Sequence, residues 1–303
     1  MFELLDKNIV IVSENNKTSE KLVSSINEIK NIAKNYPALE TNFYNIKSID
    51  DSKLDQRLDV LISLAKKEKF ITATTIEALK NKLTPLDKFN GSFVIIDDES
   101  IIDVDNFINK LISLNYNPSD FVEDKGDFAK RGSIIDLWPI NYEKPVRIEL
   151  FDDEVDSIRV FDNNSQRTID KLDSVKIYPA SELLYDKDDY KSVINLINSD
   201  IEKKKIKDSR DQKLIDKYKQ IISYLDQSMY IANKDLITAY RDDNYSSMLD
   251  YLDEDTVFIF DDISRIYEST SKLDEKFDFD LAYQMENGEV FRAFKNYLID
   301  SND

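Results

Sequence analysis

The stretch from Arg131 to Thr168 constrains the fold more than any other part of the sequence, because it reads as successive β-strands joined by short polar turns. We expect strands at residues 133–138, 146–151 and 155–161, and a fourth at residues 175–178. Strands joined this closely pair with their neighbours along the chain, so the segment predicts an antiparallel meander.

Side chains alternate between the two faces of a strand, and this sets the faces of residues 146–151. The aliphatic positions mark the face toward the core: Val146, Ile148 and Leu150. Arg147 and Phe151 lie on the opposite face, and Arg131 opens the preceding strand at the end expected near Phe151. Arginine and aromatic residues are enriched at the energetic centres of protein–protein interfaces, and on a stiff strand they lose little freedom on binding. This trio is therefore a candidate protein-binding surface.

The residues alone leave an alternative open, and they favour it. Phe151 would cover a helix, and the two arginines would form surface ion pairs with Glu149, Asp153 or Glu154. Single exposed apolar side chains are normal on protein surfaces, so they do not by themselves indicate a binding site.

Strands and helices alternate in the remainder of the chain. We expect strands at residues 8–13, 70–74, 93–96 and 257–260, and helices at residues 18–33, 52–67, 76–82, 104–114 and 214–225. Apolar runs in the strands indicate burial, and the alternation favours a parallel sheet covered by helices. The strand at residues 257–260 would return the chain to this α/β layer.

The composition excludes several kinds of chemistry. The chain has neither cysteine nor histidine, which excludes disulfides, thiolate nucleophiles, histidine general bases and most zinc sites, although Mg²⁺ bound by carboxylates is compatible with it. The net charge of −19 disfavours nucleic acid as a partner and disfavours self-association, so we expect a monomer. No segment is apolar over about 18 residues, and the first residues lack the features of a signal peptide. We therefore expect a cytoplasmic protein with no membrane partner.

Two segments, FVIIDD at residues 93–98 and VFIFDD at residues 257–262, look like the Mg²⁺-binding strand of nucleotide hydrolases. Such enzymes also need a glycine-rich loop with a lysine to hold the phosphates, and none of the four glycines lies in that pattern. A structural role at the rim of a sheet is therefore favoured. The basic run at residues 203–207 is flanked by acidic residues and favours a solvated helix face over a phosphate contact.

The segments GDFAKRGSIIDLWP, KPVRIELFDDEVDSIRVFD, SQRT and IYPASE, within residues 126–182, resemble the second domain of the bacterial transcription-repair coupling factors (Mfd). The excision-repair protein UvrB shares this module. More weakly, NIVIVSENNKTSEKL, FITATTIEAL and LDYLDEDTVFIFDD resemble the two halves of the UvrB-like α/β domain. The chain has no P-loop, and residues 44–59 leave no room for the hairpin that UvrB uses on DNA. The resemblance is therefore closer to the coupling factors, and we interpret the chain as an N-terminal piece of one.

The resemblance implies a discontinuous α/β domain with a P-loop-NTPase-like parallel sheet that lacks a P-loop. We expect its halves at residues 1–100 and 181–303, with a β-rich domain inserted at residues 101–180. In the family this insert docks the damage-recognition ATPase UvrA through two arginines and a phenylalanine, which fall on Arg131, Arg147 and Phe151. The arginines would pair with carboxylates of UvrA and the ring would fill an apolar contact. With the resemblance added, an interface is favoured over surface ion pairs.

The expected function is recruitment of UvrA to RNA polymerase stalled at DNA damage, without catalysis and without a cofactor in this chain. In the family, RNA polymerase and DNA are bound by further domains, which include an ATP-dependent motor, and a C-terminal domain masks the UvrA-binding face at rest. The alternative is a nucleotide-dependent DNA-binding enzyme of the UvrB type, which measurable ATP binding would favour.

Overall fold

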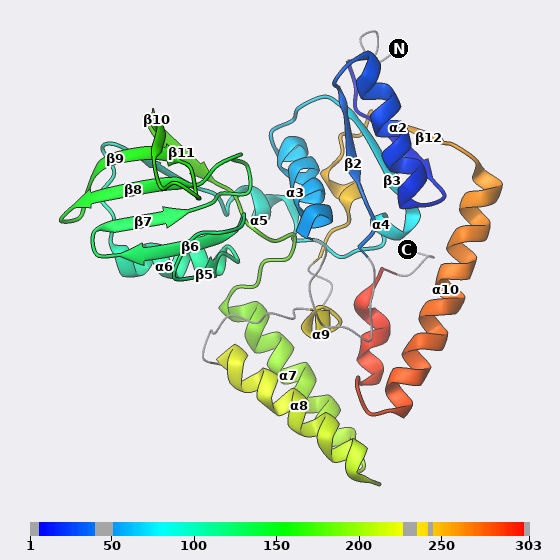
Figure 1. Cartoon of the computed structure of the whole chain (residues 1–303). Coiled ribbons are helices and arrows are strands. Elements are labelled where there is room, and N and C mark those ends of the chain that lie inside the picture. The colour runs from blue at the N-terminus through cyan, green and yellow to red at the C-terminus, as the bar shows by residue number, and fades with distance from the viewer. Residues whose placement is uncertain (1–5, 40–50, 227–234, 242–244, 300–303) are drawn as a thin grey trace. The chain divides into compact units, whose positions relative to one another are not determined.

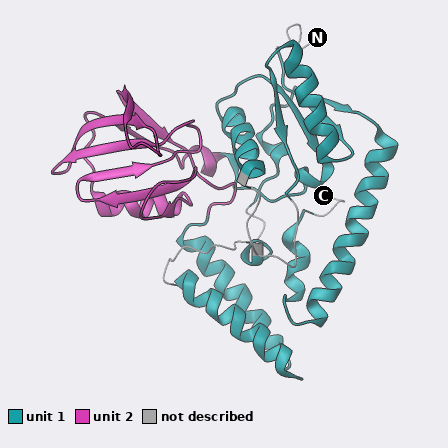
Figure 2. Cartoon of the chain, in the orientation of Figure 1, with its two compact units in different colours: residues 1–86, 185–303 teal, residues 87–184 magenta. Residues whose placement is uncertain are grey.

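The fold is described by a computed structural model that covers residues 6–39, 51–226, 235–241 and 245–299 (Figure 1). The chain divides into two compact units: unit 1 combines residues 1–86 with residues 185–303, and unit 2 is formed by residues 87–184 (Figure 2). The architecture is mixed α/β, with a parallel sheet in unit 1 and a largely antiparallel sheet in unit 2, as the sequence predicts. Residues 44–50, part of the interval in which no DNA-binding hairpin is expected, lie outside the described residues.

Unit 1 contains a four-stranded parallel sheet with the strand order β12-β1-β3-β2. Its strands are β1 (Ile9–Ser13), β2 (Ala33–Tyr36), β3 (Ile71–Thr75) and β12 (Val257–Phe260). The central strands β1 and β3 are buried, as their apolar sequences predict. A buried strand was predicted at residues 257–260; the strand is present, but the prediction that it is buried is wrong. β12 forms beside β1, but it is the last strand of the sheet and leaves Phe258, Ile259 and Phe260 exposed.

Helices make up most of the remainder of unit 1. They are α2 (Asn16–Ile29), α3 (Asp51–Ala65), α4 (Ile76–Leu79), α7 (Lys187–Lys203), α8 (Ser209–Asp226), α9 (Asp235–Thr238) and α10 (Ile263–Glu286), with short 3-10 turns η1 (Met248–Tyr251) and η2 (Arg292–Tyr297). The apolar stripe predicted for α8 is buried at Leu214, Tyr218 and Leu225, and α8 packs against α7. No helix in the described residues is both long enough and apolar enough to cross a membrane.

The helix predicted at residues 18–33 is too long, because α2 ends at Ile29. The Asn27 side chain replaces the helical hydrogen bonds that would follow. Its Oδ1 accepts from the backbone N–H groups of Ile32 and Ala33 at 3.0 and 2.8 Å, and its Nδ2 donates to the Ala33 carbonyl at 2.9 Å. These bonds turn the chain into β2, whose sequence AKNY lacks the apolar run by which strands were recognised.

Unit 2 contains a six-stranded sheet with the strand order β10-β9-β8-β7-β6-β5. The strands are β5 (Asn117–Pro118), β6 (Asp127–Arg131), β7 (Ile134–Leu137), β8 (Val146–Phe151), β9 (Glu154–Phe161) and β10 (Thr168–Leu172). From β6 to β10 each strand is antiparallel to the next, which confirms the predicted meander. The short helix α5 (Leu86–Asn90) lies at the start of this unit, and α6 (Val104–Ser113) matches the helix predicted at residues 104–114.

Two strands pair differently from the prediction. Residues 93–96 were expected in the parallel sheet and residues 175–178 in the meander. Instead, β4 (Val94–Asp97) and β11 (Ser174–Ile177) pair with each other, antiparallel, as a separate two-stranded sheet of unit 2. The meander in turn contains β6 and β10, which were not predicted. A short apolar run identifies a strand but does not identify its partner.

The two faces of β8 are as the alternation predicts. Val146, Ile148 and Leu150 are buried, whereas Phe151 at the end of the strand is exposed. The hairpin between β6 and β7 turns at Gly132, whose φ of +62° lies in a region that residues with a Cβ rarely adopt. Pairing with β7 and β9 fixes the register of β8, and this fixes the positions of the side chains on the face opposite the core.

Trp138 is half-buried just after β7. Its Nε1 donates to the Tyr142 carbonyl at 3.1 Å, so the indole is held in one orientation while one side of it meets solvent. It is the chain's single tryptophan, and it lies in unit 2.

Trp138 fluorescence should therefore report on unit 2 alone. We expect a fragment of residues 87–184 to fold without unit 1, since a compact unit with its own core can fold alone. Its Trp138 emission should follow the same urea transition as in the whole chain. A fragment whose emission without urea already matches that of an unfolded chain would contradict this independence.

Candidate protein-binding surface on the six-stranded sheet

Asp136 is a buried carboxylate at the centre of the face that carries the predicted trio. It lies on β7, in register with Arg147 on β8 and with Ala129 on β6. Its side chain is only 2% exposed. A carboxylate taken out of water needs hydrogen bonds and positive charge around it, so its partners determine what this face looks like.

Arg147 is the first partner of Asp136, and it binds the carboxylate with two parallel hydrogen bonds. Its Nε donates to Oδ1 at 2.6 Å and its Nη2 to Oδ2 at 2.9 Å. The same Nη2 donates to Oε1 of Gln166 at 2.8 Å, and the guanidinium lies over the buried Phe161 ring at 4.6 Å. The hydrogen bond to Asp136 raises the pKa of Arg147, and the charge of Glu149 adds to this, although burial lowers it. Arg147 is therefore a fixed, permanently charged group.

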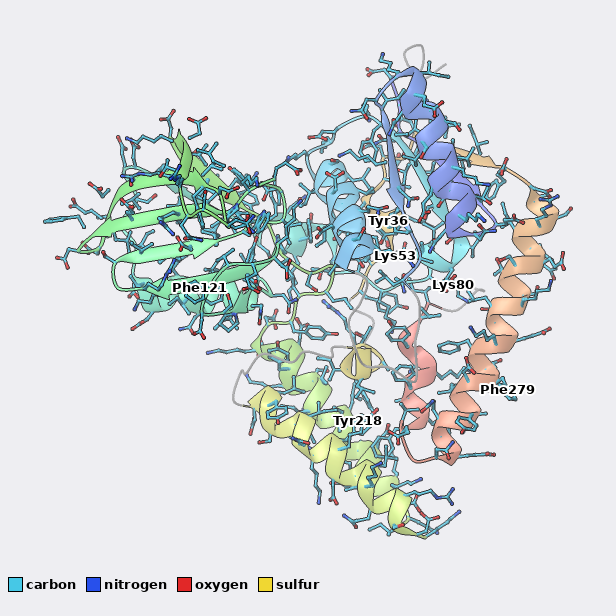
Figure 3. All side chains as sticks on the ribbon, viewed as in Figure 1. Tyr36, Lys53, Lys80, Phe121, Tyr218 and Phe279 are labelled. Atoms are coloured by element: carbon cyan, nitrogen blue, oxygen red, sulfur yellow. The ribbon has the colours of Figure 1, made fainter. Side chains whose placement is uncertain are left out.

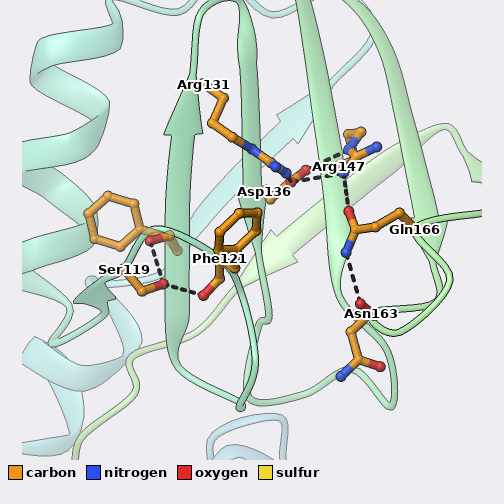
Figure 4. Close-up of polar contacts among 8 residues, drawn as sticks. Ser119, Phe121, Arg131, Asp136, Arg147, Asn163 and Gln166 are labelled. Carbon is orange, nitrogen blue, oxygen red and sulfur yellow. Dashed lines mark hydrogen bonds and ion pairs between the residues drawn. The ribbon is translucent and has the colours of Figure 1, made fainter.

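Arg131 is the second partner of the same carboxylate (Figure 4). Its Nη2 donates to Oδ2 of Asp136, and its guanidinium lies over the Phe121 ring at 5.2 Å. The side chain of Arg131 is 42% exposed, against 19% for Arg147. Two positive charges thus share one negative charge, and the group has a net positive charge in a chain whose overall charge is −19. Nη1 of both arginines and Nε of Arg131 make no hydrogen bond within the described residues.

Phe151 lies on the same face and is 77% exposed. It is four residues along β8 from Arg147, or about 13 Å in an extended strand. Arg131 is in register with Ile134 and Ile134 with Glu149, which places Arg131 two strands across and two residues short of Phe151. The structure therefore puts all three predicted residues on one face, with the two arginines in contact with one carboxylate and the ring at the end of the strand.

Two details of the prediction change. Arg131 ends β6 rather than opening the strand that pairs with β8, because β6 was missed. The carboxylate bound by the arginines is Asp136, not Glu149, Asp153 or Glu154, and Glu149 pairs instead with Arg159 at 3.1 Å. Asp136 was missed because its role depends on strand register. The signal that was present is its place between the apolar neighbours Ile135 and Leu137, which puts it on the face away from the core.

A tight turn supports Arg147 from the side. Gln166, which binds Arg147, also donates through Nε2 to the Asn163 carbonyl at 2.8 Å. Asp162 closes the turn, since its Oδ1 accepts from the backbone N–H of Ser165 at 2.9 Å and from the Ser165 hydroxyl at 3.0 Å. These bonds, with Lys144, hold the pKa of Asp162 at about 2, below its usual 3.8.

The motifs that resemble nucleotide-hydrolase strands have structural roles in the described residues. Asp262 caps the start of α10, where its Oδ1 accepts from the backbone N–H groups of Ser264 and Arg265, both at 3.1 Å. Asp97 accepts from the Ser100 hydroxyl at 2.5 Å. Across the described residues, no three acidic side chains gather as a metal site would need. The basic run is split between the end of α7 and the loop that follows, and its Lys204 pairs with Asp211 at 2.6 Å.

Comparisons with known proteins agree with the division of the chain into two units, because one family match lies within unit 2. Residues 94–183 match the family model of the UvrB interaction domain. The chain is 31% identical over 268 residues to the transcription-repair-coupling factor of Bacillus subtilis (strain 168), which covers 86% of this chain and 22% of that protein. It is 27% identical over 296 residues to that of Staphylococcus aureus (strain MRSA252), covering 94% of this chain and 25% of the relative. The chain thus spans about a quarter of the length of these relatives.

Removing Arg147 should destabilise unit 2, because Asp136 would keep only one of its two positive partners. We expect Arg147→Ala to lower the free energy of unfolding by about 1–3 kcal/mol, less than for a fully buried pair because Arg147 is partly exposed. Arg159→Ala is the matched control, since its pair with Glu149 is more exposed and should contribute less than about 1 kcal/mol. Urea unfolding followed by Trp138 fluorescence measures both. Equal losses would contradict a special role for Asp136.

The turn that supports Arg147 should show an unusually acidic Asp162. Its carboxyl is expected to titrate at about 2 in the folded chain, against 3.8 ordinarily. Because the folded-state pKa is the lower one, the stabilisation is fully present above about pH 4 and is lost as the pH falls through 2. Carboxyl NMR titration checks this, and Ser165→Ala should raise the value by removing the hydroxyl donor. A wild-type value near 3.8 would disprove this account of the turn.

Proposed function

This chain is a relative of the transcription-repair-coupling factors and contains a UvrB interaction domain, and we propose that it docks the excision-repair protein UvrA through unit 2. The docking would link RNA polymerase stalled at damaged DNA to nucleotide excision repair. RNA polymerase and DNA would be bound by parts of the relatives that this chain does not span. The chain itself would act as a monomer and would need no cofactor.

The observation that carries the proposal is the exposed Phe151 beside two arginines held by one buried carboxylate. All of these residues lie within the matched UvrB interaction domain at residues 94–183. An exposed phenyl ring on a rigid strand offers apolar contact area at little cost in conformational entropy. The guanidinium groups keep unused N–H donors but are already oriented, so they can bind acceptors on a partner without first being ordered.

Pairing with Asp136 changes how the arginines would be used. Each arginine would bind UvrA while it keeps its hydrogen bond to Asp136, and would not have to move to form a new ion pair. A guanidinium group that stays paired with Asp136 costs less free energy to desolvate when the partner covers it. Partner carboxylates or carbonyl oxygens would then accept hydrogen bonds from the remaining N–H groups of Arg131 and Arg147.

For unit 1 we propose a structural role derived from a nucleotide-hydrolase-like sheet. Three observations support this: the parallel order β12-β1-β3-β2, the absence of a P-loop motif from the sequence, and the use of Asp262 as a helix cap. The discontinuous chain path of unit 1 fits such a domain with unit 2 inserted into it. The rival is a nucleotide-dependent enzyme of the UvrB type. No measurable ATP binding is expected, and binding would favour the rival.

The docking surface should lose affinity when its exposed members are truncated. We expect Phe151→Ala, and separately Arg131→Ala, to weaken UvrA binding by about 1–2 kcal/mol or more, a factor of roughly five to thirty in Kd. Calorimetry with purified UvrA measures this. Phe151→Ala should leave urea unfolding nearly unchanged, because the ring is exposed.

Phe279→Ala is the control for Phe151. Phe279 lies on α10 in unit 1 (Figure 3) and is 72% exposed, close to the 77% of Phe151, so the two substitutions remove the same group at similar exposure. It should leave UvrA affinity unchanged. If Phe151→Ala and Arg131→Ala both bind UvrA as tightly as the unsubstituted chain, this face is not the docking surface.

A further inference from the structure

We propose that the docking surface extends beyond the predicted trio to a second aromatic anchor, Phe121, on the far side of Arg131. The inference rests on the proposed function and deepens it, because it adds a residue that determines which partner surface fits. Phe121 lies in the segment between β5 and β6, outside the strands on which the trio was recognised.

Phe121 is exposed and lies against the guanidinium cluster. Its ring is 58% exposed. The guanidinium carbon of Arg131 is 5.2 Å from the ring centre, within the range of a cation–π contact, while Nη2 of the same arginine binds Asp136 (Figure 4). Arg131 therefore lies between an exposed ring and a buried carboxylate. Phe121, Arg131, Asp136 and Arg147 form one continuous chain of contacts.

The segment that carries Phe121 is fixed by hydrogen bonds. The Ser119 hydroxyl donates to the Phe121 carbonyl at 2.7 Å, and the Ser119 backbone N–H donates to the Phe128 carbonyl of β6 at 2.9 Å. Further along, the backbone N–H of Asp124 donates to Oδ2 of Asp127 at 3.1 Å. A ring on a segment tied to the sheet in this way is preorganised, and an anchor that is already in place loses little entropy when a partner covers it.

Each of the two arginines lies over an aromatic ring, but one ring is buried and the other is exposed. Arg147 lies over Phe161, which is buried, whereas Arg131 lies over Phe121, which is exposed. A buried ring can only support the cation above it. An exposed ring supports the cation and also presents its own surface to a partner. This difference selects Phe121, and not Phe161, as an additional contact residue.

The arrangement fits one kind of partner surface. Phe121 contacts the positively charged group through Arg131, Phe151 lies on the same strand as Arg147, and both rings are exposed. Three guanidinium nitrogens of the group make no hydrogen bond within the described residues. The complementary surface has two apolar contacts separated by a carboxylate. A second copy of this chain fits poorly, because each copy has a net charge of −19. The occupant that the proposed function supplies is UvrA, which would bind here through an acidic group flanked by apolar side chains.

The test is the affinity of the whole chain for purified UvrA. Phe121→Ala should raise Kd by about fivefold to thirtyfold, similar to Phe151→Ala, while Phe279→Ala should change Kd less than about twofold. Phe121→Leu keeps apolar bulk but loses the aromatic face, and its Kd should lie between wild type and Phe121→Ala. Combining Phe121→Ala with Arg131→Ala should weaken binding by less than the product of the two single effects, because the side chains touch.

The outcomes separate this inference from the proposed function. An unchanged Kd for Phe121→Ala, with a raised Kd for Phe151→Ala, overturns the second anchor and leaves the docking function standing. Unchanged values for both, or no binding by the unsubstituted chain, overturn both proposals. A homodimer in sedimentation that Phe121→Ala dissociates also overturns the inference, since the ring would then contact a second copy. Unaltered Trp138 fluorescence in each variant confirms that the fold of unit 2 is retained.

Discussion

The binding face of unit 2 depends on one buried carboxylate shared by two guanidinium groups. Asp136 has almost no contact with water, and within the described residues its charge is compensated by ion pairs with Arg131 and Arg147. In return its hydrogen bonds fix where both guanidinium groups lie. Long arginine side chains on an open surface would instead sample many rotamers and lose that freedom on binding. The interaction thus converts two flexible cations into a rigid feature.

The sheet supplies the register that makes this interaction form. Asp136 and Arg147 are directly paired across β7 and β8, and Arg131 reaches the same carboxylate from β6. A slip of one residue in any of these strands would turn its side chains to the opposite face. Phe151 is the last residue of β8, two residues beyond Glu149, which pairs with Arg159. Backbone pairing of the strands therefore places an exposed apolar ring and the charged arginines on the same face of the sheet.

Much of this could be predicted from sequence, and the limits have physical reasons. The alternation of β8 correctly assigned Val146 to the core and Phe151 to solvent, because a two-residue period needs no knowledge of a partner strand. Asp136 and Phe121 could not be assigned, since their roles depend on long-range register and on a loop. β12 was predicted to be buried because its sequence is an apolar run. Such a run does not reveal that the strand lies at the edge of its sheet.

The chain's lack of cysteine allows the surface to be located directly. Glu154 is exposed and in register with Phe151 on the neighbouring strand, so the two share a face. A single cysteine introduced by Glu154→Cys can be labelled with a maleimide in the presence and absence of UvrA, with Tyr267→Cys on α10 as the reference. The account predicts that saturating UvrA slows labelling at position 154 severalfold and leaves position 267 unchanged. Protection at position 267 without protection at position 154 would contradict it.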